Sequence, residues 1–308
     1  MHEIQPYVLW PYVAGSAIAL ITVFVSREEL LRGNGWERIL AVGRLALAAP
    51  LAAFGAEHLT IAPFIAPMVP SWIPWHLFWA YFVGCSLIAA GLSIATKVQV
   101  RLACTLLGIM LLFFVFSIHI LRVVANPRDR FAWAVVLRDS AFAGGAWALA
   151  GSEIAWRNLG SKLIFVGRLL IGVAAIFFAV EHFLHPTALP GVPLEKLTPT
   201  WVPGRIVVDY LTGAFLAAAG IALVLGKNSG RAALYLGTWI LLLVLIIYLP
   251  MVLVIPPAAE GGVKIEGVNY FFDTLLFAGA VLAFANAMPG SRRTNSAQYQ
   301  RTISEAKA

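Results

Sequence analysis

Apolar residues run along most of this chain in long stretches, and polar residues are confined to the short segments between them. Nine such stretches are each about the length that an α-helix needs to cross the ~30 Å hydrocarbon layer of a membrane. They cover residues 7–26, 39–56, 72–95, 102–124, 131–155, 163–184, 201–225, 232–254 and 268–287. Backbone amides cannot bond to water inside lipid, so each stretch should be helical. The pattern predicts an all-α, polytopic membrane helix bundle with about nine transmembrane helices.

Composition agrees with this pattern and excludes a water-soluble domain. Of 308 residues, 60% are hydrophobic and 12% charged, against roughly 45–50% and 25% in soluble proteins. The net charge of +7 is spread over the loops instead of forming a basic stripe. We therefore expect the lipid bilayer as a partner, and no nucleic acid. Cys85 and Cys104 lie inside apolar stretches and form no CxxC pair, so we expect packing roles for both.

The distribution of Lys and Arg over the loops predicts the orientation. The loops on one side carry most of the basic residues, which places that side in the cytoplasm. The N-terminus is then outside and the C-terminus cytoplasmic, in a bacterial-type cytoplasmic (inner) membrane. The first stretch is too long and too weakly basic at its start for a cleaved signal peptide. The polar tail, residues 289–308, reads as a disordered cytoplasmic extension.

Motifs recur in the same order in the two halves of the chain. The aligned pairs include Val42-Gly43-Arg44 with Val166-Gly167-Arg168, Glu57-His58 with Glu181-His182, Trp72-Ile73-Pro74 with Trp201-Val202-Pro203, Tyr81 with Tyr210, Gly84 with Gly213, Gly91 with Gly220, Gly108 with Gly237, His119 with Tyr248, and Asp139 with Asp273. After an N-terminal helix and loop (1–36), this predicts a first unit (37–158) and a second unit (159–288) of four helices each. An even number of spans gives both units the same direction, so they are tandem parallel repeats about an axis along the membrane normal.

At these motifs the chain resembles two fused copies of the DoxX-like family of four-helix membrane proteins. The resemblance covers residues 39–152 and 163–287. The family is named after a small subunit of a terminal quinol oxidase, and similar proteins are associated with thiol stress and respiratory accessory complexes. The resemblance implies an accessory subunit of a respiratory or redox membrane complex, a membrane protein partner, and quinone as a candidate ligand. The extra first helix and the fusion leave open whether a family partner still binds.

Ionisable side chains inside a membrane cost roughly 2.5–3.5 kcal/mol each on insertion scales, so each one needs a reason. The repeated ones are our candidates for ligand binding. They are Glu57, His58, Glu181, His182, Asp139, Asp273, Arg44 and Arg168. Two alternatives remain open: the Glu, His and Asp residues could form a structural hydrogen-bond network, and the two arginines could tie helices together or reach toward the membrane surface.

Three further patterns each include a residue that is not repeated, namely His185, His119 or Asp209. Glu181, His182 and His185 have spacings that share a helix face, which makes them weak candidates for a metal site in the second unit. His58 and His119 could ligate haem from facing helices, but nothing else in the spacing demands iron and we do not expect haem. Asp209, which aligns with Ala80, should pair with Arg205 four residues earlier.

The chain contains no nucleophile elbow, phosphate loop or zinc signature. We therefore expect a non-catalytic accessory or redox-associated membrane subunit. The alternatives are a small-solute or ion carrier with a site between the two units, and a structural membrane scaffold.

Overall fold

The computed structural model describes residues 6–154, 157–192, 196–254 and 261–288, and the predicted disordered tail lies outside these residues. The helices are α1 (Pro6–Val25), α2 (Arg27–Arg32), α3 (Gly35–Thr60), α4 (Ala62–Ile65), α5 (His76–Thr96), α6 (Val100–Phe114), α7 (Ile120–Ala125), α8 (Arg130–Ser152), α9 (Arg157–Leu184), α10 (Arg205–Leu225), α11 (Ser229–Leu243), α12 (Leu249–Val254) and α13 (Gly261–Ala287). A 3-10 turn, η1 (Ala66–Met68), and two π-helical turns, η2 (Val115–His119) and η3 (Val244–Tyr248), complete them. The described part of the chain contains no strand, which confirms the all-α prediction.

Within the described residues, seven helical segments are long and apolar enough to cross a membrane. Two of them are continuous because a π-helical turn joins α6 to α7 and α11 to α12. The apolar part of α1 is shorter, and α8, which carries Arg138 and Asp139, is not among the seven. The chain is therefore a multi-pass membrane protein by the length and composition of its helices.

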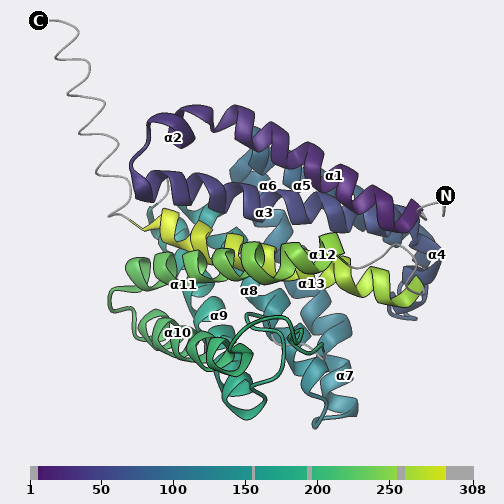
Figure 1. Cartoon of the computed structure of the whole chain (residues 1–308). Coiled ribbons are helices and arrows are strands. Elements are labelled where there is room, and N and C mark those ends of the chain that lie inside the picture. Colours follow the sequence, from purple (N-terminus) through teal and green to yellow (C-terminus); the bar gives the residue numbers. More distant parts are fainter. Residues whose placement is uncertain (1–5, 155–156, 193–195, 255–260, 289–308) are drawn as a thin grey trace, which may run out of the picture.

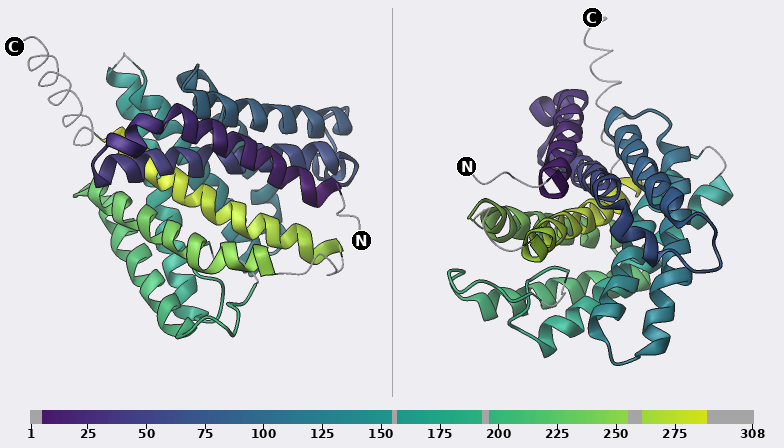
Figure 2. Two further views of the ribbon diagram at one scale, coloured as in Figure 1. Left: turned by 45° about the horizontal axis from the view of Figure 1, so that its top comes forward. Right: turned by 90° about the vertical axis from the view of Figure 1, so that its right-hand side faces the viewer.

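Helix α13 runs through the middle of the bundle and packs against α3, α8 and α11 (Figures 1 and 2). Small residues let these helices approach closely. A Cβ atom at Gly145 on α8 would lie 2.5 Å from the Cα atom of Ala280 on α13. One at Gly43 on α3 would lie 2.6 Å from the Cβ atom of Leu282. Inside lipid, where apolar burial drives association weakly, such close packing holds helices together.

Two of the four long pairs of aligned helices in the predicted units have equal lengths. Helices α5 and α10 have 21 residues each, α6 and α11 have 15 each, and the π-helical turns η2 and η3 have five each at aligned positions. Left-handed backbone conformations also occur at aligned positions, at Trp75 and Gly204 and again at Gln99 and Asn228. Helices α5 and α10 pack on α3 and α9 respectively.

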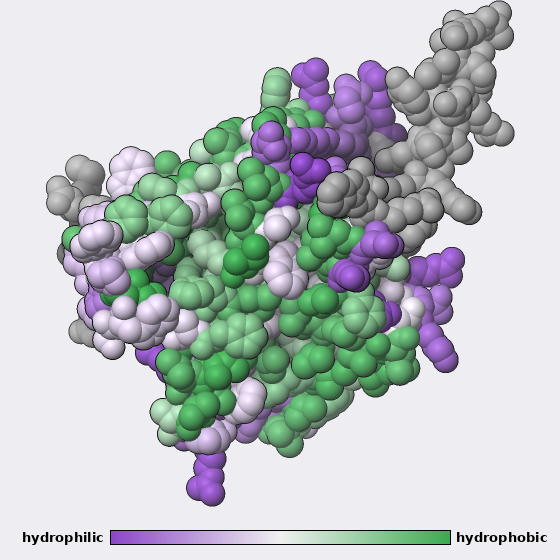
Figure 3. Space-filling view, turned by 180° about the vertical axis from the view of Figure 1, so that it is seen from behind, coloured by the Kyte–Doolittle hydropathy of each residue, from purple (hydrophilic) through white to green (hydrophobic). Residues whose placement is uncertain are grey.

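The bundle has two ends, which we name after residues that lie there. Helices α3 and α9 begin at the Arg44 end and finish at the His58 end, and α8 and α13 run the opposite way. Figure 3 shows apolar side chains across the middle of one face, with strongly hydrophilic residues gathered toward the end from which the C-terminal tail leaves. The tryptophans at the His58 end, including Trp72 and Trp75, are exposed, as expected for side chains at the level of lipid headgroups.

Candidate functional site

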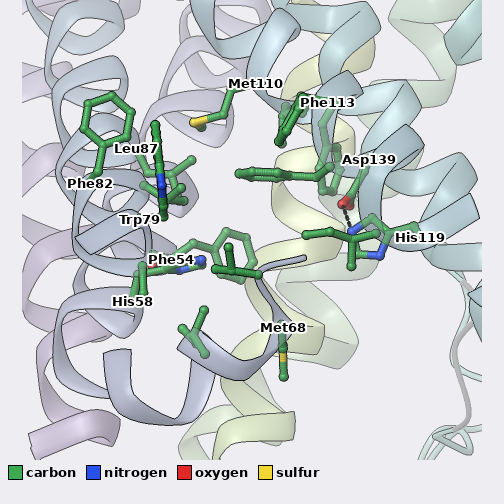
Figure 4. A pocket seen from close by; sticks show the side chains of 18 of the residues that line it. Phe54, His58, Met68, Trp79, Phe82, Leu87, Met110, Phe113, His119 and Asp139 are labelled. Carbon is green, nitrogen blue, oxygen red and sulfur yellow. Dashed lines mark hydrogen bonds and ion pairs between the residues drawn. The ribbon is translucent and has the colours of Figure 1, made fainter. Parts of the chain in front are cut away.

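The first unit contains a cavity of about 550 Å³, which we call the open cavity. Helices α3, α5, α6 and α8 surround it, together with η1, η2 and part of α13. Its walls are apolar and rich in aromatic rings and sulfur (Figure 4), and they include Phe54, Met68, Trp79, Phe82, Leu87, Met110 and Phe113. The volume lies within the range of typical small-molecule sites, about 300–1,000 Å³.

The cavity reaches the outer surface of the bundle between α5 and α6. Phe82 on α5 is 48% exposed and Phe113 on α6 is 45% exposed, although both line the cavity. The ring of Trp72, from the connector before α5, packs edge-on against Phe113 with centroids 6.4 Å apart. In a membrane this surface meets lipid tails, so a lipophilic molecule can reach the cavity without crossing water.

One wall of the cavity carries a charged network of four residues, His119, Arg138, Asp139 and Asp273. The guanidinium of Arg138 donates from Nη1 to Asp273 Oδ2 at 2.6 Å and from Nε to Asp139 Oδ1 at 2.9 Å. His119 Nε2 lies 3.1 Å from Asp139 Oδ2 (Figure 4). The two aspartates share one guanidinium. Charged side chains away from water are tolerated when they are paired and hydrogen-bonded in this way. The network joins the two units because Asp273 belongs to the second.

The structure brings the two predicted aspartates together, but sequence reasoning overlooked Arg138, which links them. Arg138 is not a repeated residue, because it aligns with Phe272. The available signal was a basic residue beside an acid in the middle of an apolar stretch. Such a pair inside a membrane is by default a functional hypothesis.

His58 and Glu57, although adjacent, face different surroundings. His58 lines the open cavity, and its Nδ1 lies 2.8 Å from the carbonyl oxygen of Phe54. In the neutral ring Nδ1 then donates to that carbonyl, which leaves Nε2 as a hydrogen-bond acceptor. Glu57 is buried beside α13 and faces the side chain of Asn269; with the amide nitrogen of Asn269 turned toward Glu57, it donates to the two carboxylate oxygens at 3.1 and 3.3 Å.

In the second unit, His182 is fully buried and both of its ring nitrogens face protein groups. Nε2 accepts the backbone N–H of Gly191 at 3.1 Å, and Nδ1 lies 2.8 Å from Asp209 Oδ1. The predicted pairing of Asp209 with Arg205 is wrong. Arg205 donates to the carbonyl oxygen of Thr198 in the connector. Asp209 is fully buried on the side of α10 that faces His182, whereas the long Arg205 side chain reaches the end of the helix.

Glu181 also has a partner outside its predicted group. Arg130 at the start of α8 donates to Glu181 Oε2 from Nε at 2.7 Å and from Nη2 at 2.6 Å. Glu181, His182 and His185 therefore do not assemble as a metal site. Among the described residues, no group of three His, Cys, Asp or Glu side chains is placed to hold a metal ion. Helical spacing alone was misleading because Glu181 binds Arg130, 51 residues earlier, and His182 binds Gly191 in the following connector.

The region of the second unit that aligns with the open cavity is filled by the chain itself. The connector between α9 and α10 turns inward, and we call its residues 189–192 the plug segment. Leu189 is fully buried and Val192 is 1% exposed. Besides the Gly191 contact to His182, the hydroxyl of Tyr248 donates to the Pro190 carbonyl at 3.0 Å. The plug segment is therefore held between the helices by both packing and hydrogen bonds.

Arg44 and Arg168 lie at the opposite end of the bundle. Arg44 Nη1 donates to Ser26 Oγ at 3.1 Å and lies 3.8 Å from Glu29 Oε1. Arg168 lies over the ring of Phe165, 5.0 Å from its centroid, and touches Gly226 where α10 ends. Both arginines therefore hold neighbouring segments together, as in the structural alternative we considered.

No known protein family, curated protein or solved structure matches this chain.

Proposed function

We propose that this membrane protein binds a lipophilic small molecule in the open cavity of its first unit. The observation that carries the proposal is a cavity of about 550 Å³ whose apolar and aromatic walls end at the charged network. Predominantly apolar walls with a few convergent polar groups are the usual character of a ligand site. Apolar walls bind the body of such a molecule, and the polar groups orient its head.

The proposal includes the organisation of the chain as two parallel, tandem four-helix units of DoxX-like type after one leading helix. The equal lengths of α5 and α10 and of α6 and α11, together with the two aligned π-helical turns, support it. The site then belongs to one unit only, because the plug segment fills the aligned region of the other. With nine spans and the basic residues on the cytoplasmic side, the N-terminus is outside the cytoplasmic (inner) membrane and the C-terminus inside.

Within this proposal, an accessory role in a respiratory or redox membrane complex, beside a membrane protein partner, makes quinone the first ligand to test. The aromatic walls of the cavity, Phe54, Trp79 and Phe113 among them, suit a flat ring. Its polar groups suit a ring that bears hydroxyls better than one with carbonyls only. Two of the five N–H groups of Arg138 already donate to acids, and the Nε2 atom of His58 is an acceptor.

A second candidate, a carrier for a small solute or ion, is favoured by the position of His119. This residue also lines a neighbouring cavity of about 380 Å³ with Arg122 and Asp129, at the His58 end of the bundle. His119 therefore stands between a polar recess and the open cavity. The charged network beside it joins the two units, which is where a carrier site was expected.

The test is to purify the protein in mild detergent from its native membranes and to identify lipophilic molecules in an organic extract by mass spectrometry. We expect one compound near one equivalent per chain. Ala80→Phe should abolish it, because Ala80 is buried in the cavity wall and a phenyl ring there fills the space. The matched control is Leu92→Phe, on the same helix at an exposed position. An extract identical for the wild type and a folded Ala80→Phe variant would refute the proposal.

A further inference from the structure

We propose that His58 anchors the cavity ligand by accepting, at Nε2, a hydrogen bond from a hydroxyl or amide N–H group of that ligand. The inference rests on the proposed function and adds the chemical class of the ligand: a lipophilic alcohol, phenol or amide. The support comes from the second unit, where the plug segment shows which hydrogen-bonding group is bound at the position that aligns with the open cavity.

The plug segment occupies the space that is hollow in the first unit. A Cβ atom at Gly191 would lie 3.8 Å from both Ile240 Cδ1 and the Tyr248 hydroxyl. These two residues align with Leu111 and His119, and both of those line the open cavity. The plug segment is thus an internal occupant whose surroundings correspond to the walls of the open cavity.

The plug segment meets those walls as an apolar body with one close hydrogen-bond donor at a histidine, the carbonyl oxygen of the same residue, Gly191, lying farther away at 3.4 Å from the same nitrogen. Its side chains Leu189 and Val192 are buried. The Gly191 N–H between them donates to His182 Nε2 at 3.1 Å. His182 aligns with His58. The position to which the Gly191 N–H points in the second unit is therefore the position from which His58 faces the open cavity in the first.

The two histidines present the same nitrogen by different means. Asp209 faces Nδ1 of His182, and its place on α5 is taken by Ala80. His58 instead holds Nδ1 against the Phe54 carbonyl at 2.8 Å. In the tautomer that carries its proton on Nδ1, each ring presents Nε2 as the acceptor. The Phe54 carbonyl therefore faces Nδ1 of His58 in the unit that lacks the aspartate, as Asp209 faces Nδ1 of His182 in the other.

An acceptor on an apolar wall discriminates between ligands. A molecule that fills the cavity without donating a hydrogen bond leaves Nε2 desolvated and unpaired, which is unfavourable. A molecule with a donor at the same place satisfies it. We commit to a small molecule from the bilayer as the occupant, because the cavity reaches the surface of the bundle between α5 and α6 at the exposed rings of Phe82 and Phe113.

The experiment compares two fluorescent probes of nearly equal shape, 2-naphthol, which has a hydroxyl donor, and 2-methoxynaphthalene, which has none. Binding to the purified protein in lipid nanodiscs is measured by fluorescence. The signal of the Ala80→Phe variant, whose cavity is filled, measures partition of the probe into lipid and is subtracted. We expect naphthol to bind about two- to tenfold more tightly than the ether, the range of one neutral hydrogen bond.

Variants assign the preference to His58. His58→Leu should bind both probes equally, and His58→Gln, whose carbonyl can accept, should restore part of the preference. The control His76→Leu changes another histidine at the same end of the bundle, outside the open cavity, and should keep the preference intact.

Equal affinity for both probes in the wild type, or a preference that survives in His58→Leu, would overturn the inference and leave the cavity as a site. If neither probe binds above the Ala80→Phe background and no lipophilic compound is extracted, the proposed function fails as well.

Discussion

The helices of the two predicted units surround different interiors. In the first, the connector before α5, residues 61–75, forms short turns at the end of the bundle and leaves a cavity behind it. In the second, the connector before α10, residues 185–204, is five residues longer, and its plug segment is buried between the helices. The comparison teaches that a few additional residues in a connector can decide whether the interior between the helices is open or filled.

The polar groups follow the same division. In the filled unit, His182 and Tyr248 both bond to the plug segment. In the open unit, the aligned His58 and His119 both line the cavity, and His119 turns to Asp139. In the second unit the plug segment thus provides hydrogen-bond partners for His182 and Tyr248. The first unit keeps the acceptor of His58 and the charged network beside the open cavity. Three predictions test this contrast.

The largest effect should come from Arg138→Leu, which tests whether the open unit depends on the charged network. This change leaves Asp139 and Asp273 without their shared partner in a buried place, and breaking a buried pair in this way costs about 3–5 kcal/mol. Equilibrium unfolding in detergent measures the loss. Arg138→Leu combined with Asp139→Asn and Asp273→Asn should recover at least half of it. A loss below about 1 kcal/mol for the single variant would show that the network adds little.

A smaller effect is expected from truncating the plug segment. Leu189→Ala removes a fully buried side chain and should reduce the free energy of unfolding by about 2–5 kcal/mol. The matched change in the open unit is Met68→Ala, at a cavity-lining residue that is 46% exposed, and it should stay within about 0.5 kcal/mol. Equal losses for the two variants would contradict the division into a filled and an open unit.

The smallest effect is expected from Tyr248→Phe, which removes only the hydroxyl that donates to the Pro190 carbonyl. The loss should be about 1 kcal/mol, the net contribution of one hydrogen bond. Tyr235→Phe, at an exposed tyrosine of α11, is the control and should change stability by less than about 0.5 kcal/mol. If both variants unfold alike in the same denaturation experiment, the bond does not hold the plug segment.

Part of the candidate site was predictable because some of its chemistry repeats along the chain. Asp139 and Asp273 stood out as charges at aligned positions of apolar stretches, and His58 as one of a matched pair. Arg138 and the role of Asp209 were missed since neither is repeated. Pairing Asp209 with Arg205 relied on spacing along one helix, whereas the observed neighbour, His182, lies on another.

The sequence by itself determined that this chain is a bundle of apolar helices, because each helix satisfies its own backbone within a few residues and inside lipid nothing else can. The tertiary structure decided which charges meet, for Arg138 and Asp273 are 135 residues apart in sequence. It also decided which unit is open. Whether a proline-rich connector lies on the surface or enters the bundle depends on the space left between helices, and that space is set by side chains from all four of them at once.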